Sequence, residues 1–299
     1  MNIQNQRFIG SYSSGNDGGL LIVSAGVHGN EPSGVIAFKN VLEILEKERP
    51  EIQGTIVGVY GNRPALQKEV RYIDEDLNRT WTVNNVQNKI TDSTEKKEMF
   101  DIINALGHYP QHDFSASYFL DCHTTSSDSL PYISVQETGG NDAWAHQFPT
   151  HIIRGFSDIV SGCIDHYLSR SGYTGFVFEG GQHQSKHAVT HHTGMIWSVI
   201  EKSCRLDLQT LTHFPESVKN LRKYKNEQKT FEIVYRHEIK DGESFAMQPG
   251  FENFQPIQKG DLLAIHNHEE IKSEWNAFIF MPLYQSKGND GFFIVESVL

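Results

Sequence analysis

The sequence contains few cysteines, and they lie far apart. Cys122, Cys163 and Cys204 are the three cysteines among 299 residues, and no two form a CxxC pair. A disulfide framework or a cysteine-rich zinc module needs closely spaced cysteines, so the sequence argues against both. Widely spaced free thiols fit a reducing compartment. We therefore expect a cytoplasmic protein.

Long apolar runs and an excess of basic residues are also missing. No apolar stretch approaches the roughly 20 residues that cross a bilayer, and the N-terminal segment lacks the basic and apolar regions of a secretion signal. Lys and Arg number 26 against 37 Asp and Glu, which gives a net charge of -11. Nucleic acids are bound by clustered Lys and Arg. We expect neither a membrane nor a nucleic-acid partner, and an anionic substrate would need a local positive charge.

Several catalytic signatures are absent as well. The sequence has no GxSxG elbow, no phosphate-binding P-loop and no dinucleotide-binding glycine fingerprint. A serine hydrolase, a kinase and a nicotinamide-dependent oxidoreductase would therefore each lack a key part.

The first two thirds of the chain alternates apolar runs with helical patterns. Residues 19–27 form a nearly continuous apolar run, which is typical of a strand covered on both faces. Apolar residues at three-to-four spacing predict a helix over 32–48, and a strand at 54–60 completes a β-α-β unit. Further elements are predicted as strands at 117–123, 131–136 and 175–181, a helix around 155–169 and a helix inside 187–211. The pattern predicts an α/β domain.

The character of the sequence changes after residue 217. Residues 217–230 are polar, basic and almost free of large apolar side chains, as in a linker or a solvated face. The remaining stretches are short, alternate in hydrophobicity and are separated by Gly, Pro, Asn and Asp, which predicts a small β domain. We therefore predict an α/β domain over 1–220 and a C-terminal β domain over 221–299 that begins with the basic linker.

Three residues at the ends of predicted strands are candidate metal ligands. His28 and Glu31 follow the first strand, where open α/β sheets place their ligand sites, and this mixture of ligands suits zinc. Alone, HxxE is a weak signal in a chain with 15 histidines, and Glu31 can simply favour a helix N-terminus. His123 ends another strand two residues after Asp121, which can orient it. The alternative for His123 is a capping or core histidine.

Two further stretches offer polar side chains. Arg71 and Arg79 flank three acidic residues in RYIDEDLNR. This segment is either a salt-bridged surface loop or a source of guanidinium groups that match a carboxylate or an oxyanion. Glu179 ends the apolar strand of GFVFEGG and is either paired at a sheet edge or exposed to a ligand as a general base.

Together these stretches resemble the succinylglutamate desuccinylase and aspartoacylase family, which is related to the zinc carboxypeptidases. GVHGNE, GNRPAL, RYIDEDLNR, DCHTT and the strand-end Glu179 occur in the order of that family, and the resemblance covers most of the chain. It implies a zinc-carboxypeptidase-like mixed sheet flanked by helices, with a small C-terminal β domain.

The resemblance also implies a role for individual residues. One Zn²⁺ per chain is expected, with His28, Glu31 and His123 as its ligands. Glu179 would be the general base, Arg71 would polarise the carbonyl, Asn78 and Arg79 would grip a substrate carboxylate, and Asp76 matches an acidic position near the site. Arg63 is assigned no role, because the family usually has Pro at that position of GNRPAL.

The expected reaction is hydrolysis of the amide bond of an N-acyl amino acid by zinc-activated water. Zinc and the two arginines would supply the positive charge that a small anionic substrate needs. Two alternatives stay open: a zinc carboxypeptidase acting on short peptides, and a metal-binding protein without turnover. The sequence leaves the acyl group, the amino acid and a possible homo-oligomer undecided.

A second group of histidines is spaced by four residues. His183, His187 and His191 could share one helix face and bind a metal there. No acidic ligand accompanies them, which disfavours a second metal site.

Overall fold

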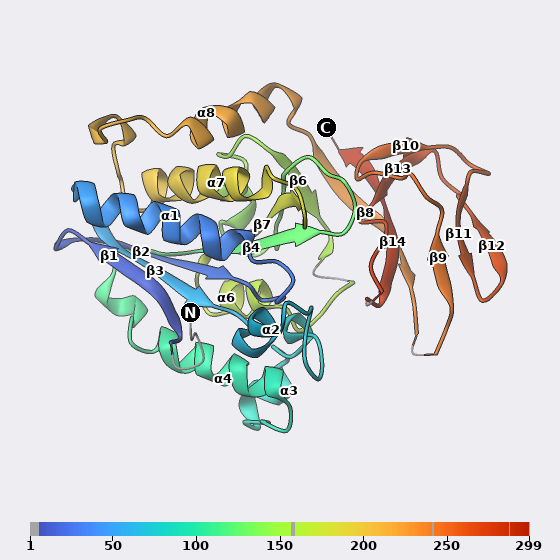
Figure 1. Ribbon diagram of the computed structural model, residues 1–299, viewed down its shortest axis with the longest axis horizontal. Helices are drawn as coiled ribbons and strands as arrows, with labels where there is room; N and C mark the ends of the chain where they lie inside the picture. Colours follow the sequence, from blue (N-terminus) through green and yellow to red (C-terminus); the bar gives the residue numbers. More distant parts are fainter. Residues whose placement is uncertain (1–5, 157–158, 241, 287, 299) are drawn as a thin grey trace.

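One large mixed sheet organises the molecule. The computed structural model describes residues 6–156, 159–240, 242–286 and 288–298, and eleven of its strands form this sheet (Figure 1). From one edge to the other the strands are β1 (Phe8–Ser13), β3 (Gln53–Tyr60), β2 (Asn16–Ala25), β4 (Ser117–Thr125), β7 (Thr174–Gln182), β5 (Tyr132–Ser134), β6 (His151–Arg154), β8 (Thr230–Glu238), β14 (Asp290–Val298), β13 (Ala277–Phe280) and β10 (Gln255–Ile257).

The part of the sheet that positions the site is parallel. β2 pairs in parallel with β3 and β4, and β4 pairs in parallel with β7. Leu21 and Val23 of β2 are buried in one core cluster, and Leu20 and Ile22 are buried in another on the opposite face. This burial on both faces accounts for the continuous apolar run. The carboxyl ends of β2, β4 and β7 meet at one edge of the sheet, where ligand sites form in open α/β folds.

Helices cover both faces of the parallel strands (Figure 1). One face carries α1 (Ser33–Glu48), α7 (Ala188–Ser203) and α8 (Glu216–Arg222), and the other carries α4 (Thr94–Leu106) and α6 (Ile164–Arg170). The shorter helices are α2 (Arg63–Lys68), α3 (Val83–Gln87) and α5 (Asn141–Ala145), with 3-10 turns η1 (Leu77–Arg79), η2 (Gln111–Asp113), η4 (Leu208–Thr210) and η5 (Lys223–Glu227).

The C-terminal strands extend the large sheet and add a small one. β8 pairs in parallel with β6 and antiparallel with β14, so hydrogen bonding continues from the α/β part into the C-terminal strands. A separate three-stranded sheet contains β12 (Glu269–Lys272), β11 (Leu262–His266) and β9 (Phe245–Met247). The predicted α/β architecture with C-terminal β structure is confirmed, whereas the division at residue 220 stays a prediction.

The helix predicted around 155–169 is mostly wrong. Among the described residues it is confined to α6, and the preceding residues 151–154 form strand β6. Gly155 and Gly162 have φ angles of 91° and 80°, which a regular right-handed helix does not contain. Residues 157 and 158 of this prediction lie outside the described residues.

Of the two interpretations of residues 217–230, a linker or a solvated face, the structure favours the solvated face. The first part of this stretch belongs to α8, and the 3-10 turn η5 follows directly. Val218 and Leu221 lie three residues apart and are both 0% exposed against the core that includes α7. Two apolar positions are enough to fix this short helix, because packing rather than propensity stabilises short helices. The remaining polar side chains form a solvated face.

The packing of α8 gives a stability prediction. Replacing Leu221 by Ala removes a fully buried side chain, and we expect the free energy of unfolding to fall by about 2–5 kcal/mol. Glu216→Ala on the exposed face of the same helix should change it by no more than about 0.5 kcal/mol. Urea denaturation of both variants checks this. Equal effects would mean that α8 is not part of the core.

Candidate functional site

The loop between β2 and α1 is held in place by its glycine. A Cβ on Gly29 would overlap the backbone of Ala65 in α2, so this position requires glycine. The Gly29 amide also donates to the carbonyl oxygen of Arg71, at 3.2 Å. His28 directly precedes Gly29, and Glu31 follows two positions later. The fixed backbone of Gly29 therefore holds both side chains in the interior.

The structure brings the three candidate metal ligands together. His28 Nδ1 lies 2.9 Å from Glu31 Oε1, and His123 Nδ1 lies 3.3 Å from Glu31 Oε2. One ligand atom from each residue lies within 4.8 Å of the other two. All three residues are buried. The carboxylate thus sits between two imidazoles contributed by the ends of two neighbouring parallel strands.

The other ring nitrogens of both histidines contact carboxylates. His28 Nε2 lies 3.0 Å from Asp76 Oδ1, and His123 Nε2 lies 2.8 Å from Asp121 Oδ2. In the tautomer with a hydrogen on each Nε2, the two outer carboxylates accept and each Nδ1 turns its lone pair towards Glu31. A metal-binding histidine commonly donates its second N–H to a carboxylate in this way.

With this tautomer, a cation is needed between the two Nδ1 atoms and Glu31. Lone pairs on both nitrogens and on the carboxylate would otherwise face one another. Burial alone would lower the pKa of His123, but Asp121 and Glu31 raise it well above its ordinary value, so a proton can occupy this position. A metal ion competes with that proton for the same lone pair. The nitrogen and oxygen donors fit a divalent ion such as zinc.

Glu179 lies beside this cluster at the end of β7. It is opposite His123 in the pairing of β4 with β7, and its side chain is buried. Burial raises the pKa of Glu179 to about 8, and Oε2 has no hydrogen-bond partner. A carboxyl group that titrates near neutral pH can accept a proton and return it.

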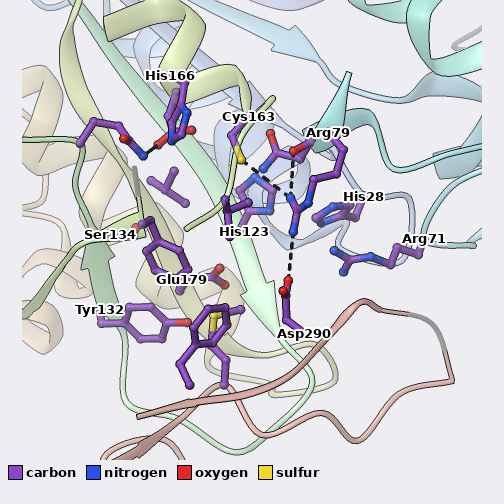
Figure 2. A pocket seen from close by; sticks show the side chains of 18 residues that line it. His28, Arg71, Arg79, His123, Tyr132, Ser134, Cys163, His166, Glu179 and Asp290 are labelled. Atoms are coloured by element: carbon purple, nitrogen blue, oxygen red, sulfur yellow. Dashed lines mark hydrogen bonds and ion pairs between the residues drawn. The ribbon is translucent and has the colours of Figure 1, made fainter. Parts of the chain in front are cut away.

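Arg71 borders the same cluster. Its Nη2 donates to Asp76 Oδ2 at 2.9 Å, and its Nη1 lies 3.8 Å from Glu31 Oε1. Asp76 therefore fixes both His28 and Arg71. The guanidinium lines the pocket that contains His28 and Glu179 (Figure 2).

Asn78 and Arg79 follow in the 3-10 turn η1. The Asn78 side-chain oxygen accepts a hydrogen bond from the Ile164 amide at 2.9 Å. The NH₂ group of Asn78 therefore remains to donate to a ligand. Arg79 Nη2 donates to Asp290 Oδ2 at 3.0 Å, and Asp290 also accepts from Arg236 Nε at 2.6 Å. The Arg79 guanidinium is thus already engaged on one side by the first residue of β14.

The pocket contains residues that no sequence motif marked. They come from β5, from α6 and the residues before it, and from the C-terminal strands: Tyr132, Gln136, Cys163, Asp165, His166, Met281, Asp290 and Phe293. Their sequence neighbourhoods look like ordinary strand and helix starts. Only the tertiary structure places them beside the predicted site.

The second histidine group forms hydrogen bonds within the protein. His183 contacts Thr124 Oγ1 and Gln285 Oε1 through its two ring nitrogens, and His191 contacts the Gly180 carbonyl and the Tyr224 hydroxyl. In the described part of the chain no cluster of metal-binding side chains includes them.

Arg63, to which the sequence assigned no role, forms ion pairs with Glu98 at 2.8 Å and Asp101 at 2.6 Å. These contacts are consistent with a structural position at the start of α2.

Comparison with known proteins identifies the family. The model of the succinylglutamate desuccinylase/aspartoacylase catalytic domain matches residues 17–189, more than half of the chain. The chain belongs to this family. Over 294 residues it is 27% identical to an N-acyl-aromatic-L-amino acid amidohydrolase (carboxylate-forming) of Xenopus tropicalis, with 89% of each protein covered.

Two further proteins are similar, one in sequence and one in fold. The chain is 23% identical over 278 residues to a succinylglutamate desuccinylase of Pseudoalteromonas atlantica, with 86% of this chain and 74% of that protein covered. The crystal structure of murine aminoacylase 3 matches with a TM-score of 0.63 at 16% identity, covering 95% and 96% of the two chains.

The family and fold implied by the sequence motifs are thereby confirmed, and so is the prediction of a hydrolase. The roles of the individual side chains stay predictions. Within the described ranges, no helix has both the length and the hydropathy to cross a membrane.

Metal binding can be measured directly. We expect the chain to bind one Zn²⁺, and His123→Ala to weaken binding by more than the roughly 10–100-fold typical of changes to the outer shell. Competition with a chromophoric chelator gives the affinity. His187→Ala, which alters an exposed histidine, is the control and should bind zinc like the unaltered chain. Tight stoichiometric binding by His123→Ala would disprove the ligand assignment.

Proposed function

We propose that the chain is a zinc-dependent hydrolase that cleaves the amide bond of N-acyl amino acids and releases a carboxylate and an amine. The observation that carries this proposal is the arrangement of Glu31 between His28 and His123, with the unpaired carboxyl of Glu179 beside them. The names of the relatives, an N-acyl amino acid amidohydrolase and a desuccinylase, support the substrate class.

His28, Glu31 and His123 would hold the metal ion, and Asp76 and Asp121 would orient the two imidazoles. Zinc bound there would polarise the amide carbonyl and lower the pKa of a water molecule. The protein contributes the fixed directions of the donor atoms. These are preset because each ring has a carboxylate at its second nitrogen.

Glu179 is the proposed proton carrier. Its free Oε2 atom can accept a proton from the attacking water, and the neutral carboxyl can then give that proton to the leaving nitrogen. Arg71, held by Asp76, is the proposed donor to the oxyanion that forms on the amide carbonyl. Loss of one such donor typically costs about 10²–10³-fold in rate.

Asn78 and Arg79 are the proposed carboxylate grip. The Asn78 NH₂ group is available in the pocket, and so are those Arg79 N–H groups that do not donate to Asp290, to the Asn78 carbonyl or to Cys163. A carboxylate held there fixes the distance of the amide from Glu179, which lowers the entropic cost of reaction. The two arginines also provide local positive potential in a chain of net charge -11.

The role of Glu179 can be tested by a single substitution. We expect Glu179→Gln to lower kcat by about 10²–10⁴-fold, because glutamine cannot carry the proton, and to leave zinc stoichiometry unchanged. Steady-state kinetics on N-acetyl and N-succinyl amino acids, with zinc content measured on the same samples, check this. Full activity of the variant would contradict the assignment.

The substrate class is tested with the unaltered zinc-loaded chain. N-acyl amino acids and dipeptides with free carboxyl ends are compared in parallel. We expect higher kcat/KM for the N-acyl amino acids. Faster cleavage of the dipeptides would favour a carboxypeptidase instead.

A further inference from the structure

Several buried polar atoms without partners belong to residues that line the pocket. Among the described residues, Glu179 Oε2, Tyr132 Oη, Asp165 Oδ1 and His166 Nε2 all lack a hydrogen bond, and all four residues line it. Buried polar groups nearly always have a partner, within the protein or from water or a ligand. The free oxygen of Glu179 has a role in the proposed reaction, but the free atoms of Asp165 and His166 have no role in it.

His166 lies at the end of the pocket away from Arg71 (Figure 2), and ligand atoms of Asp165 and His166 lie within 4.8 Å of each other. Figure 2 shows His166 on one side, Arg71 on the other and His123 between them. Both residues belong to the first turn of α6, and they are 2% and 6% exposed. This end of the pocket is therefore polar at its wall although it is shielded from solvent.

The Asp165 carboxyl is only half satisfied. Its Oδ2 accepts from Gln136 Nε2 at 2.7 Å, and Oδ1 is left free. In the described part of the chain, no lysine or arginine lies within ion-pair distance of Asp165. Burial raises the pKa of Asp165 even with His166 beside it, so the ionised form of this carboxyl carries an energetic cost. A ligand that donates a hydrogen bond or brings a positive charge would remove this cost.

We propose that Asp165 selects substrates that carry a hydrogen-bond-donating, preferably cationic, group at this end of the pocket. The inference rests on the proposed function and narrows its substrate class to N-acyl amino acids with an amine, amidine or imidazole group. That group can belong to the amino-acid side chain or to the acyl part. A second carboxylate is disfavoured there, because it would lie against Asp165.

A metal ion is the competing occupant. Ligand atoms of Cys163, Asp165 and His166 lie within 4.8 Å of one another. However, Cys163 Sγ is 3.8 Å from Arg79 Nη1, which places a fixed positive charge beside any ion bound there. Burial also raises the pKa of the Cys163 thiol, so the thiolate that a metal requires is disfavoured. A substrate group that binds Asp165 and His166 needs no thiolate, and its charge can lie on the side of Asp165 away from Arg79.

Matched substrate pairs test the proposal on the unaltered zinc-loaded chain. Nα-acetyl-L-lysine is compared with N-acetyl-L-norleucine, and N-(4-aminobutanoyl)-L-leucine with N-pentanoyl-L-leucine. We expect the cationic member of one pair to have a kcat/KM about 10-fold or more above that of its apolar partner. The pair that shows it identifies which part of the substrate reaches Asp165. N-acetyl-L-glutamate should be cleaved more slowly than the preferred cationic substrate.

The second part of the experiment repeats the substrate comparison with the Asp165→Asn variant. The substitution should reduce the preference for the cationic member of the responding pair by about 10-fold or more, measured as the ratio of the two kcat/KM values on the same sample. Asp92→Asn, which alters an exposed acid, is the control and should keep the preference. Because the substrate pairs are also measured on the unaltered chain, a variant that fails to fold leaves the test intact.

Three results would overturn the proposal in distinguishable ways. Efficient cleavage of the apolar substrates without a cationic preference refutes the role of Asp165 and leaves the proposed function standing. Inactivity towards every N-acyl amino acid refutes both. A second equivalent of bound zinc that Cys163→Ser removes would assign this end of the pocket to a metal ion.

Discussion

The position of the Glu31 carboxylate between His28 and His123 is the interaction on which the site depends. It joins residues separated by 92 positions, and the Thr124 amide adds a further hydrogen bond to Glu31 Oε2 at 2.8 Å. This meeting is possible because β2 and β4 are parallel neighbours whose carboxyl ends lie at one edge. The charges buried there favour a bound cation, so the fold and the proposed metal site stabilise each other.

The same interaction extends through Asp76 to the rest of the pocket. Asp76 contacts both His28 and Arg71, and the turn that it begins carries Arg79. Arg79 in turn contacts Asp290, so the C-terminal strands reach the site through an ion pair. Because β14 belongs to the large sheet, its first residue is held at a fixed distance from the parallel strands. The C-terminal region is therefore part of the pocket wall as well as an extension of the sheet.

The sequence predicts those parts of the site that depend on local patterns. A strand buried on both faces has a continuous apolar run, and His28 follows such a run directly, so its place at the sheet edge is predictable. Asp290 and Asp165 have no comparable local signal, because their roles arise from β14 and α6 packing near distant strands. Apolar spacing predicted a helix around 155–169, but the positive φ angles of Gly155 and Gly162 are incompatible with a helix over its first part. Leu221 shows the reverse, since two buried side chains made a helix from a stretch that is otherwise polar.

The distribution of charge along the pocket links catalysis to specificity. Arg71 places positive charge near the proposed metal, Asp165 places a carboxyl group with a free oxygen on the other side, and Arg79 lies between them beside Cys163. A substrate with a carboxylate at one end and a hydrogen-bond donor at the other has a lower electrostatic energy when its donor faces Asp165. Its energy is higher when the carboxylate faces Asp165 instead. In the proposed orientation the carboxylate would lie at Asn78 and Arg79, the amide near Glu179 and the donor group at Asp165. Such a field selects for reactive alignment as well as for binding, since the reversed complex would place the amide out of reach of the proton carrier.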